Sequence, residues 1–267
     1  MPDNLKVTLV QTDIYWQQRE ANLAMLEEKL WMLEEEVDLI ILPEMFPTGF
    51  SMETEKLAEP MNFTTTRWMQ QMAKQKQAVI TGSLIIKEDN KFFNRLLWVT
   101  PAGEVNHYDK RHLFRMAHED NYFNMGLENN IVELKGWKIL PQVCYDLRFP
   151  VWSRNKSDTD GNMDYDLSFF IASWPAARVG AWDILLKARA VENLCYTLGV
   201  NRVGEDGNNI AYSGHSAAYD FKGETIATAK ENEEMVTVEL SFEALSRYRE
   251  KFPAWKDADQ FTLRTKD

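Results

Sequence analysis

Three side chains of different chemistry lie where the sequence suggests the edges of secondary-structure elements. Cys144 and Glu44 each follow an apolar run, and Lys110 lies in a polar stretch between them. A free thiol is mostly protonated near neutral pH and needs a base within hydrogen-bonding reach, which a carboxylate can supply. A lysine ammonium and the backbone N–H of Tyr145 can stabilise the negative oxygen that forms when a thiolate attacks a carbonyl. Together these residues predict amide hydrolysis through a thioester.

Each of these residues also has an ordinary structural interpretation. A lone cysteine is commonly a buried packing residue, while Glu44 and Lys110 taken singly resemble surface charges. Cys195 lies between Leu194 and Tyr196 without a polar edge, and we expect it to be structural. The chemical interpretation therefore depends on the three residues meeting at one place.

The predicted elements bring Glu44 and Cys144 to the same edge. A strand near the N-terminus, a helix over 22–36 and a strand over 37–42 form a βαβ unit with a right-handed crossover. Glu44 follows this unit, and Cys144 follows a strand over 137–143. Ligands bind at the carboxyl edge of the strands in open α/β sheets, so this edge is the predicted site.

Apolar runs and turn residues predict the remaining elements. Strands are expected over 78–86, 92–100, 131–134, 164–173, 195–203, 212–221, 225–229 and 235–240. Helices are expected from 65 or 66 to 76, near 151–155 and over 182–194. No linker or low-complexity segment separates the two α/β halves, which predicts a single domain over 1–267.

Composition limits the classes of partner. The chain has 267 residues, 45% of them hydrophobic, which is ample for a large core. Its formal net charge of −11 argues against nucleic-acid and membrane partners, since both favour a basic surface. No apolar run approaches the roughly 20 residues that span a bilayer. With two cysteines and no charged-then-apolar leader, a cytoplasmic location is expected.

The histidines do not predict a metal site. The spacing of the four, His107, His112, His118 and His215, matches no zinc motif, and no glycine-rich phosphate loop is present. We therefore expect neither a metal nor a cofactor.

Three motifs, in residues 42–46 (LPEMF), 108–114 (YDKRHLF) and 144–150 (CYDLRFP), resemble those of the nitrilase superfamily of carbon–nitrogen hydrolases. The resemblance is greatest to its omega-amidase branch, which hydrolyses 2-oxoglutaramate, and extends from the first strand to about residue 240. It implies a four-layer α-β-β-α sandwich in which Glu44 is the general base, Lys110 stabilises the oxyanion and Cys144 is the nucleophile. It also implies a second glutamate at Glu119, although Met125 replaces a proline that follows in the family pattern.

The resemblance also implies a small-molecule amide substrate and a homodimer, in which the segment after about residue 241 could lie at the interface. Substrate-binding candidates are Tyr145, Phe114, Trp174 and Arg178. A substrate carboxylate would favour a guanidinium, for which Arg178, Arg115 and Arg148 are available.

The same three side chains also fit other activities. A nitrilase or an N-carbamoyl hydrolase would use the same three side chains, and a non-catalytic interaction module could be built on the same scaffold. The release of ammonia from amides, nitriles or N-carbamoyl compounds distinguishes these alternatives.

Overall fold

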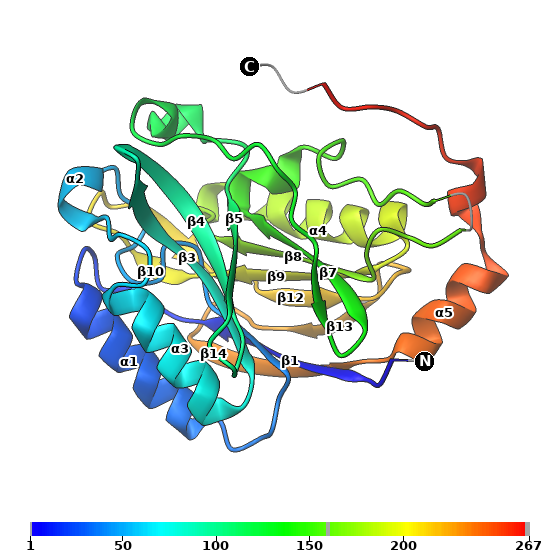
Figure 1. Ribbon diagram of the computed structural model, residues 1–267, viewed down its shortest axis with the longest axis horizontal. Coiled ribbons are helices and arrows are strands. Elements are labelled where there is room, and N and C mark those ends of the chain that lie inside the picture. Colours follow the sequence, from blue (N-terminus) through cyan, green and yellow to red (C-terminus); the bar gives the residue numbers. More distant parts are fainter. Residues whose placement is uncertain (1, 159–160, 265–267) are drawn as a thin grey trace.

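Over residues 2–158 and 161–264, which the structure describes, two six-stranded sheets pack face to face in the computed structural model (Figure 1). Helices α1 (Arg19–Met32) and α3 (Thr64–Lys76) cover the first sheet, and α4 (Val179–Asn193) covers the second. The predicted α-β-β-α order is confirmed. Residues 1, 159–160 and 265–267, which the predicted domain includes, lie outside the described residues.

Both sheets combine parallel strands at the centre with antiparallel strands at the edges. The first has the order β14 (Glu234–Leu240), β1 (Leu5–Gln11), β2 (Leu39–Ile41), β3 (Val79–Glu88), β4 (Lys91–Val99) and β5 (Val105–Asp109). The second has the order β13 (Thr225–Thr228), β12 (Ala217–Tyr219), β9 (Tyr196–Asn201), β8 (Leu167–Ala172), β7 (Trp137–Val143) and β6 (Val132–Leu134). Strands β10 (Val203–Glu205) and β11 (Ala211–Ser213) form a separate antiparallel pair.

The remaining helices are short or lie at the C-terminal end. They are α2 (Thr54–Leu57), α5 (Phe242–Lys251) and the 3₁₀ helices η1 (Arg115–Ala117), η2 (Glu119–Asn121), η3 (Cys144–Arg148), η4 (Ala176–Arg178) and η5 (Ala254–Asp257). Within the described ranges, no helix combines the length and the apolar character needed to cross a membrane.

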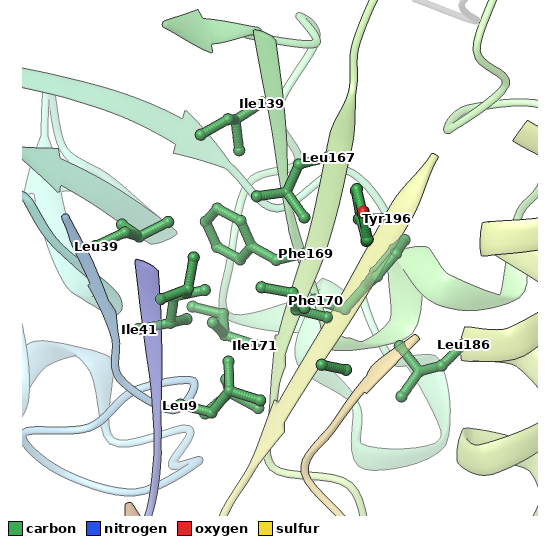
Figure 2. Packing of buried hydrophobic residues seen from close by; sticks show 14 of the residues in the cluster. Leu9, Leu39, Ile41, Ile139, Leu167, Phe169, Phe170, Ile171, Leu186 and Tyr196 are labelled. Carbon is green, nitrogen blue, oxygen red and sulfur yellow. The ribbon is translucent and has the colours of Figure 1, made fainter. Parts of the chain in front are cut away.

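The alternation of side chains along each strand builds two cores at once. Leu9 and Ile41 point from the first sheet toward Phe169 of the second, in the core that Figure 2 shows. Their neighbours Val10 and Ile40 point the other way and pack with α1 and α3. Because successive residues of a strand face opposite sides, one apolar run serves both layers.

Helix α4 lies close to β9 because a glycine leaves room for it. A Cβ atom at Gly199 would lie 2.4 Å from Leu186 and 2.7 Å from Trp182, both on α4. No side chain fits there unless the side chains of Leu186 and Trp182 shift, so Gly199 permits the close packing of α4 on β9.

Several predicted elements differ from the observed ones. The helix predicted over 22–36 ends at Met32, and the strand predicted over 212–221 is divided into β11 and β12. Gly214 and His215 divide it, because φ angles of 70° and 63° place them in the left-handed region that a strand cannot contain. The helix predicted near 151–155 was wrong: that segment has turns, and the helical turn lies earlier, in η3.

Helix α5, which was not predicted from the sequence, is fixed to the second sheet. The Ser241 hydroxyl caps its first turn by accepting from Ala244 N at 3.3 Å. Arg249 donates to Asp166 Oδ1 at 2.6 Å and to the Leu194 carbonyl at 2.8 Å. Figure 1 shows α5 and the segment after it on the outside of the sandwich. The hydrogen bonds of Arg249 favour a single domain, which stays a prediction.

Stability measurements test the inter-sheet core. Phe169 is fully buried, and its ring stacks on Trp98 of the other sheet with 6.4 Å between centroids. Phe169→Ala should lower the free energy of unfolding by about 3–5 kcal/mol, because it leaves a cavity between the sheets. The control Trp31→Ala, at a residue that is 57% exposed, should change it by less than about 0.5 kcal/mol. Equal effects of the two variants in denaturant titrations would contradict this packing.

Candidate active site

The Cys144 thiol is presented by a sharp turn at the end of β7. Val143 is still extended, whereas Cys144 takes a φ of 48°, in the left-handed region that non-glycine residues seldom adopt. The Asp146 carboxylate supports the turn by accepting from Val143 N at 3.1 Å. Such strain costs of the order of 1–3 kcal/mol and is common at functional sites. The turn leaves Cys144 only 9% exposed, at the wall of a cavity.

Glu44 is held at the end of β2 by donors from three other elements. It is fully buried, and Met45 after it has a φ of 46°. Its Oε1 accepts from Lys110 Nζ at 2.9 Å and from Asn94 Nδ2 at 2.8 Å. Its Oε2 accepts from the backbone N–H of Ser173, just after β8, at 2.8 Å. The carboxylate therefore has a fixed orientation.

Lys110 lies between two carboxylates. Its Nζ is 2.9 Å from Glu44 Oε1 and 2.9 Å from Glu119 Oε2, and all three side chains have no exposed surface. Burial alone lowers the pKa of Lys110, but the charges of Glu119 and Glu44 outweigh it and hold the pKa above its ordinary value. Burial raises the pKa of Glu119, and Lys110 opposes that shift. The ammonium is therefore permanently charged at neutral pH.

The Cys144 thiol is a weak acid in this environment. Burial raises its pKa well above the ordinary value, the Glu44 carboxylate raises it further, and the positive charge of Lys110 opposes both effects. The resting thiol is therefore protonated at neutral pH. A base must remove its proton during the reaction, and Glu44 is the carboxylate that interacts with it directly.

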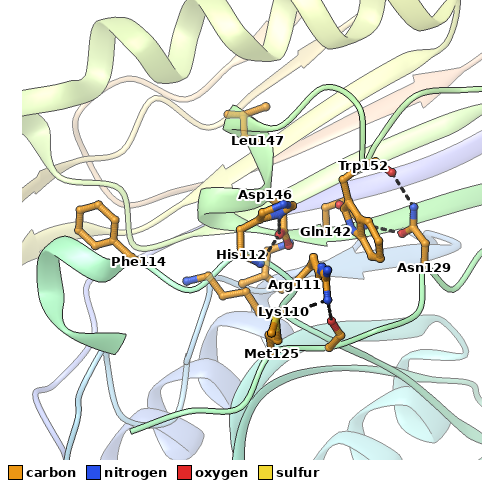
Figure 3. Close-up of polar contacts among 12 residues, drawn as sticks. Lys110, Arg111, His112, Phe114, Met125, Asn129, Gln142, Asp146, Leu147 and Trp152 are labelled. Atoms are coloured by element: carbon orange, nitrogen blue, oxygen red, sulfur yellow. Dashed lines mark hydrogen bonds and ion pairs between the residues drawn. The ribbon is translucent and has the colours of Figure 1, made fainter. Parts of the chain in front are cut away.

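The segment that carries Lys110 is tied to the turn at Cys144. His112 approaches Asp146 Oδ1 with its backbone nitrogen at 2.9 Å and with Nδ1 at 2.7 Å. Arg111 donates to the Gly126 carbonyl at 2.9 Å on another side of the segment. Figure 3 shows the Lys110 side chain pointing away from the Arg111 guanidinium. These bonds link the position of the ammonium to that of the thiol.

The thiol and the ammonium face a cavity of about 400 Å³. Its wall includes the four predicted substrate-binding residues, Tyr145, Phe114, Trp174 and Arg178. It also includes residues that were not predicted from the sequence, namely Trp16, Phe50, Asp206 and Tyr212. They come from loops and from the β10–β11 pair, whose positions over the site depend on long-range packing and have no local sequence pattern.

Two of the three candidate arginines line this cavity. The guanidinium of Arg178 lies 5.5 Å from the ring centre of Phe114, and that of Arg148 lies 4.8 Å from the ring centre of Trp174. The Arg115 side chain is 85% exposed, and its Nε lies 3.6 Å from Asp120 Oδ2. It does not line the cavity with the other two. The geometry therefore favours Arg178 and Arg148 as anion-binding groups.

Two further site residues, Asn94 and Ser173, were missed in the sequence. Asn94 is a buried amide within β4, and Ser173 acts through its backbone N–H. A single asparagine in an apolar strand has no distinguishing pattern, and a backbone donor is independent of residue type.

The remaining thiol contacts hydroxyl groups within the second sheet. Cys195 is fully buried, with Sγ 3.8 Å from Ser168 Oγ and 3.7 Å from Thr197 Oγ1. Across residues 2–158 and 161–264, no group of three or more His, Cys, Asp or Glu side chains could hold a metal ion.

Comparisons with known proteins identify the family of this chain. A model of the carbon–nitrogen hydrolase family matches residues 6–250. Omega-amidase YafV of Escherichia coli (strain K12) is 47% identical over 260 residues, which cover 97% of this chain and 98% of that protein. The 2-oxoglutaramate amidase of Bacillus subtilis (strain 168) is 28% identical over 94% of this chain and 96% of that protein.

A solved structure gives the same result. The crystal structure of XC1258 from Xanthomonas campestris, a CN-hydrolase superfamily protein with an arsenic adduct in its active site, has a TM-score of 0.96 to this chain and 46% sequence identity. The match covers 98% of this chain and 99% of that one. The family match, the similar sequences and the shared fold extend over nearly the whole chain, and the chain therefore belongs to the carbon–nitrogen hydrolase family.

Proposed function

We propose that this protein is a cysteine-dependent omega-amidase that hydrolyses the terminal amide of small dicarboxylates, such as 2-oxoglutaramate, to the 2-oxo acid and ammonia. The observation that carries the proposal is the burial of Glu44, Lys110 and Glu119 in one hydrogen-bonded cluster beside the Cys144 thiol, at the wall of a small cavity. The similarity to proteins named omega-amidase and 2-oxoglutaramate amidase supports the substrate class.

In the proposed first half-reaction, Glu44 takes the proton from Cys144 Sγ while the sulfur attacks the amide carbon. The carbonyl π electrons move to its oxygen, and Lys110 and the backbone N–H of Tyr145 stabilise that oxyanion. When the carbonyl re-forms, the C–N bond breaks, and Glu44 returns the proton to the leaving nitrogen. The products of this step are ammonia and a thioester on Cys144.

In the second half-reaction, Glu44 takes a proton from water as the water oxygen attacks the thioester carbon. The C–S bond then breaks, the acid leaves, and the proton held by Glu44 returns to the Cys144 sulfur. Nucleophile, base and oxyanion donor are all groups of the protein, so the proposed reaction requires no cofactor.

Glu119 is proposed as the residue that positions Lys110. It accepts from Lys110 Nζ with both carboxylate oxygens, at 3.0 and 2.9 Å, and its Oε2 also accepts from Phe114 N at 2.6 Å. Together with the bond to Glu44, this arrangement fixes the position of the ammonium. Phe114 is itself a proposed contact of the substrate, so the same carboxylate orders part of the cavity wall.

We propose that the substrate carboxylate binds to Arg178, with Arg148 nearby, and that Tyr145, Phe114 and Trp174 pack against the carbon chain. The guanidinium groups supply charge, and the rings under them limit their movement. An amide that carries a carboxylate at its far end satisfies both parts of the site.

We propose that the protein acts in the cytoplasm as a homodimer, without nucleic-acid or membrane partners. The net charge of −11 supports the absence of the latter two. Exposed apolar side chains on α4 and after α5 support the dimer: Ile184 is 69% exposed, Val191 46% and Phe252 53%. Val191 of α4 lines one groove with Phe252 and Trp255, and the latter two lie in the segment after residue 241.

Ammonia release tests the nucleophile and the substrate class together. Cys144→Ser should lower the rate of ammonia release from 2-oxoglutaramate by about 10³-fold or more, because a serine hydroxyl is a far weaker nucleophile without dedicated activation. Cys195→Ser, which changes the other buried thiol, should retain the wild-type rate. The rate of ammonia release is also measured separately with L-glutamine and with a simple nitrile as the substrate. Faster release from the nitrile than from the oxo-acid amide would reject the omega-amidase assignment.

Arginine variants test how the carboxylate is recognised. Arg178→Ala should raise KM for an anionic amide about tenfold or more, since a hydrogen bond to a charged group is lost, and change KM little for a neutral amide of the same length. Arg115→Ala is the matched control outside the cavity and should leave both values unchanged. Steady-state kinetics that show equal effects of Arg178→Ala on anionic and neutral amides would exclude this role.

A further inference from the structure

Asn94 contacts both carboxylates of the proposed active site from the middle of β4. It is fully buried, and its Nδ2 lies 2.8 Å from Glu44 Oε1 and 3.4 Å from Glu119 Oε1. Its backbone carbonyl accepts from Lys110 N at 3.0 Å. A change of the Asn94 side chain therefore removes the donor to the carboxylates and keeps the backbone bond that places Lys110.

The orientation of this amide is fixed by the carboxylates. With Nδ2 directed at Glu44 and Glu119, Asn94 Oδ1 has no hydrogen-bond partner within the described part of the chain. The reverse orientation would direct a carbonyl oxygen at two carboxylates, which is electrostatically unfavourable. A buried polar atom without a partner is costly, so a residue needed only for packing would be apolar here. The side chain is explained by what its NH₂ group does.

The groups that face Glu44 show why a neutral donor is useful. Lys110 is the cation in contact with it, and it is shared with Glu119. Cys144 interacts with Glu44 from η3, and Tyr212 of β11 lies close enough for the Glu44 charge to help raise the pKa of its phenol. The thiol and the phenol are both uncharged at neutral pH, so neither of them balances the negative charge of the carboxylate. The Asn94 amide gives Glu44 a second side-chain donor without adding a second positive charge.

We propose that Asn94 is a positioning residue that orients the Glu44 carboxylate to receive the proton of Cys144 and keeps it apart from Glu119. The inference rests on the proposed function in one respect, the role of Glu44 as the base. Loss of the Asn94 donor would let the carboxylate cluster retain a proton at higher pH, so the thiol would lose its base at higher pH. A residue with only a structural role would not move this pH dependence.

Alkylation of Cys144 by iodoacetamide, at the carbon that carries iodine, reports this pH dependence without turnover of 2-oxoglutaramate. The rate is measured between pH 4 and pH 9 by peptide mass mapping, which separates Cys144 from the buried Cys195. At low pH the alkylation rate falls as the base takes up a proton, and this part of the pH profile is the acid limb. In Asn94→Leu, the acid limb should move to higher pH by about one pH unit, as expected for one lost hydrogen bond to a charged group. Asn94→Asp keeps the shape of the side chain and should move the limb in the same direction, because a third carboxyl raises the proton affinity of the cluster.

Asn155→Leu is the matched control. Asn155 is a buried asparagine that donates to the Tyr165 carbonyl at 2.8 Å and lies outside the carboxylate cluster. Its replacement should lower the melting temperature and leave the acid limb in place. Asn94→Leu should also lower kcat for the amide substrate about tenfold or more with little change in KM, because Asn94 does not line the cavity.

Two outcomes would overturn the inference: an unmoved acid limb in both folded Asn94 variants, or an equal shift in Asn155→Leu. If Asn94→Leu does not fold, Asn94→Ala takes its place, because it also removes the donor and adds no charge. A shifted limb in a protein that releases no ammonia from any amide supports the role of Asn94 and rejects the proposed substrate class. The two proposals can therefore fail separately.

Discussion

One buried ammonium shared by two buried carboxylates is the constraint on which the rest of the site depends. Lys110, Glu44 and Glu119 have no exposed side-chain surface, so each needs its partners inside the protein. Removal of one partner from such a buried set typically costs about 3–5 kcal/mol, because a charge is left without compensation. Two carboxylates and one ammonium also leave an excess of negative charge, which neutral donors such as Asn94 and Ser173 N–H stabilise. The same excess makes the cluster a proton acceptor beside a thiol.

The two sheets meet this constraint through their strand ends. Glu44 follows β2 and Cys144 follows β7, both of which run in the parallel centre of their sheets, so packing of the sheets brings base and thiol together. Left-handed backbone at Met45 and at Cys144 turns the chain sharply just after the strands. The Asp146 carboxylate then joins the turn to the Lys110 segment through His112. The geometry of the site is thus set by the packing of the layers rather than by local sequence alone.

The residues that a sequence can reveal are those whose chemistry and position both stand out. Glu44 and Cys144 could be selected because each ends an apolar run, and Lys110 and Glu119 because their motifs resemble a family pattern. Asn94 lies inside a strand, and its contacts depend on residues 50 and 25 positions away, so no local pattern identified it. The division of the strand predicted over 212–221 depended on backbone angles at Gly214 and His215, which composition does not specify. Long-range pairing and backbone conformation account for what was missed.

If the buried cluster activates Cys144, the thiol forms a thioester with the amide substrate. Intact-protein mass spectrometry after rapid acid quenching of the enzyme with 2-oxoglutaramate tests this most directly. We expect an increase equal to the mass of the amide minus ammonia, located on the Cys144 peptide and absent from Glu44→Gln. Release of ammonia at the full rate from a Cys144→Ala variant, or an acyl adduct on another residue, would contradict it.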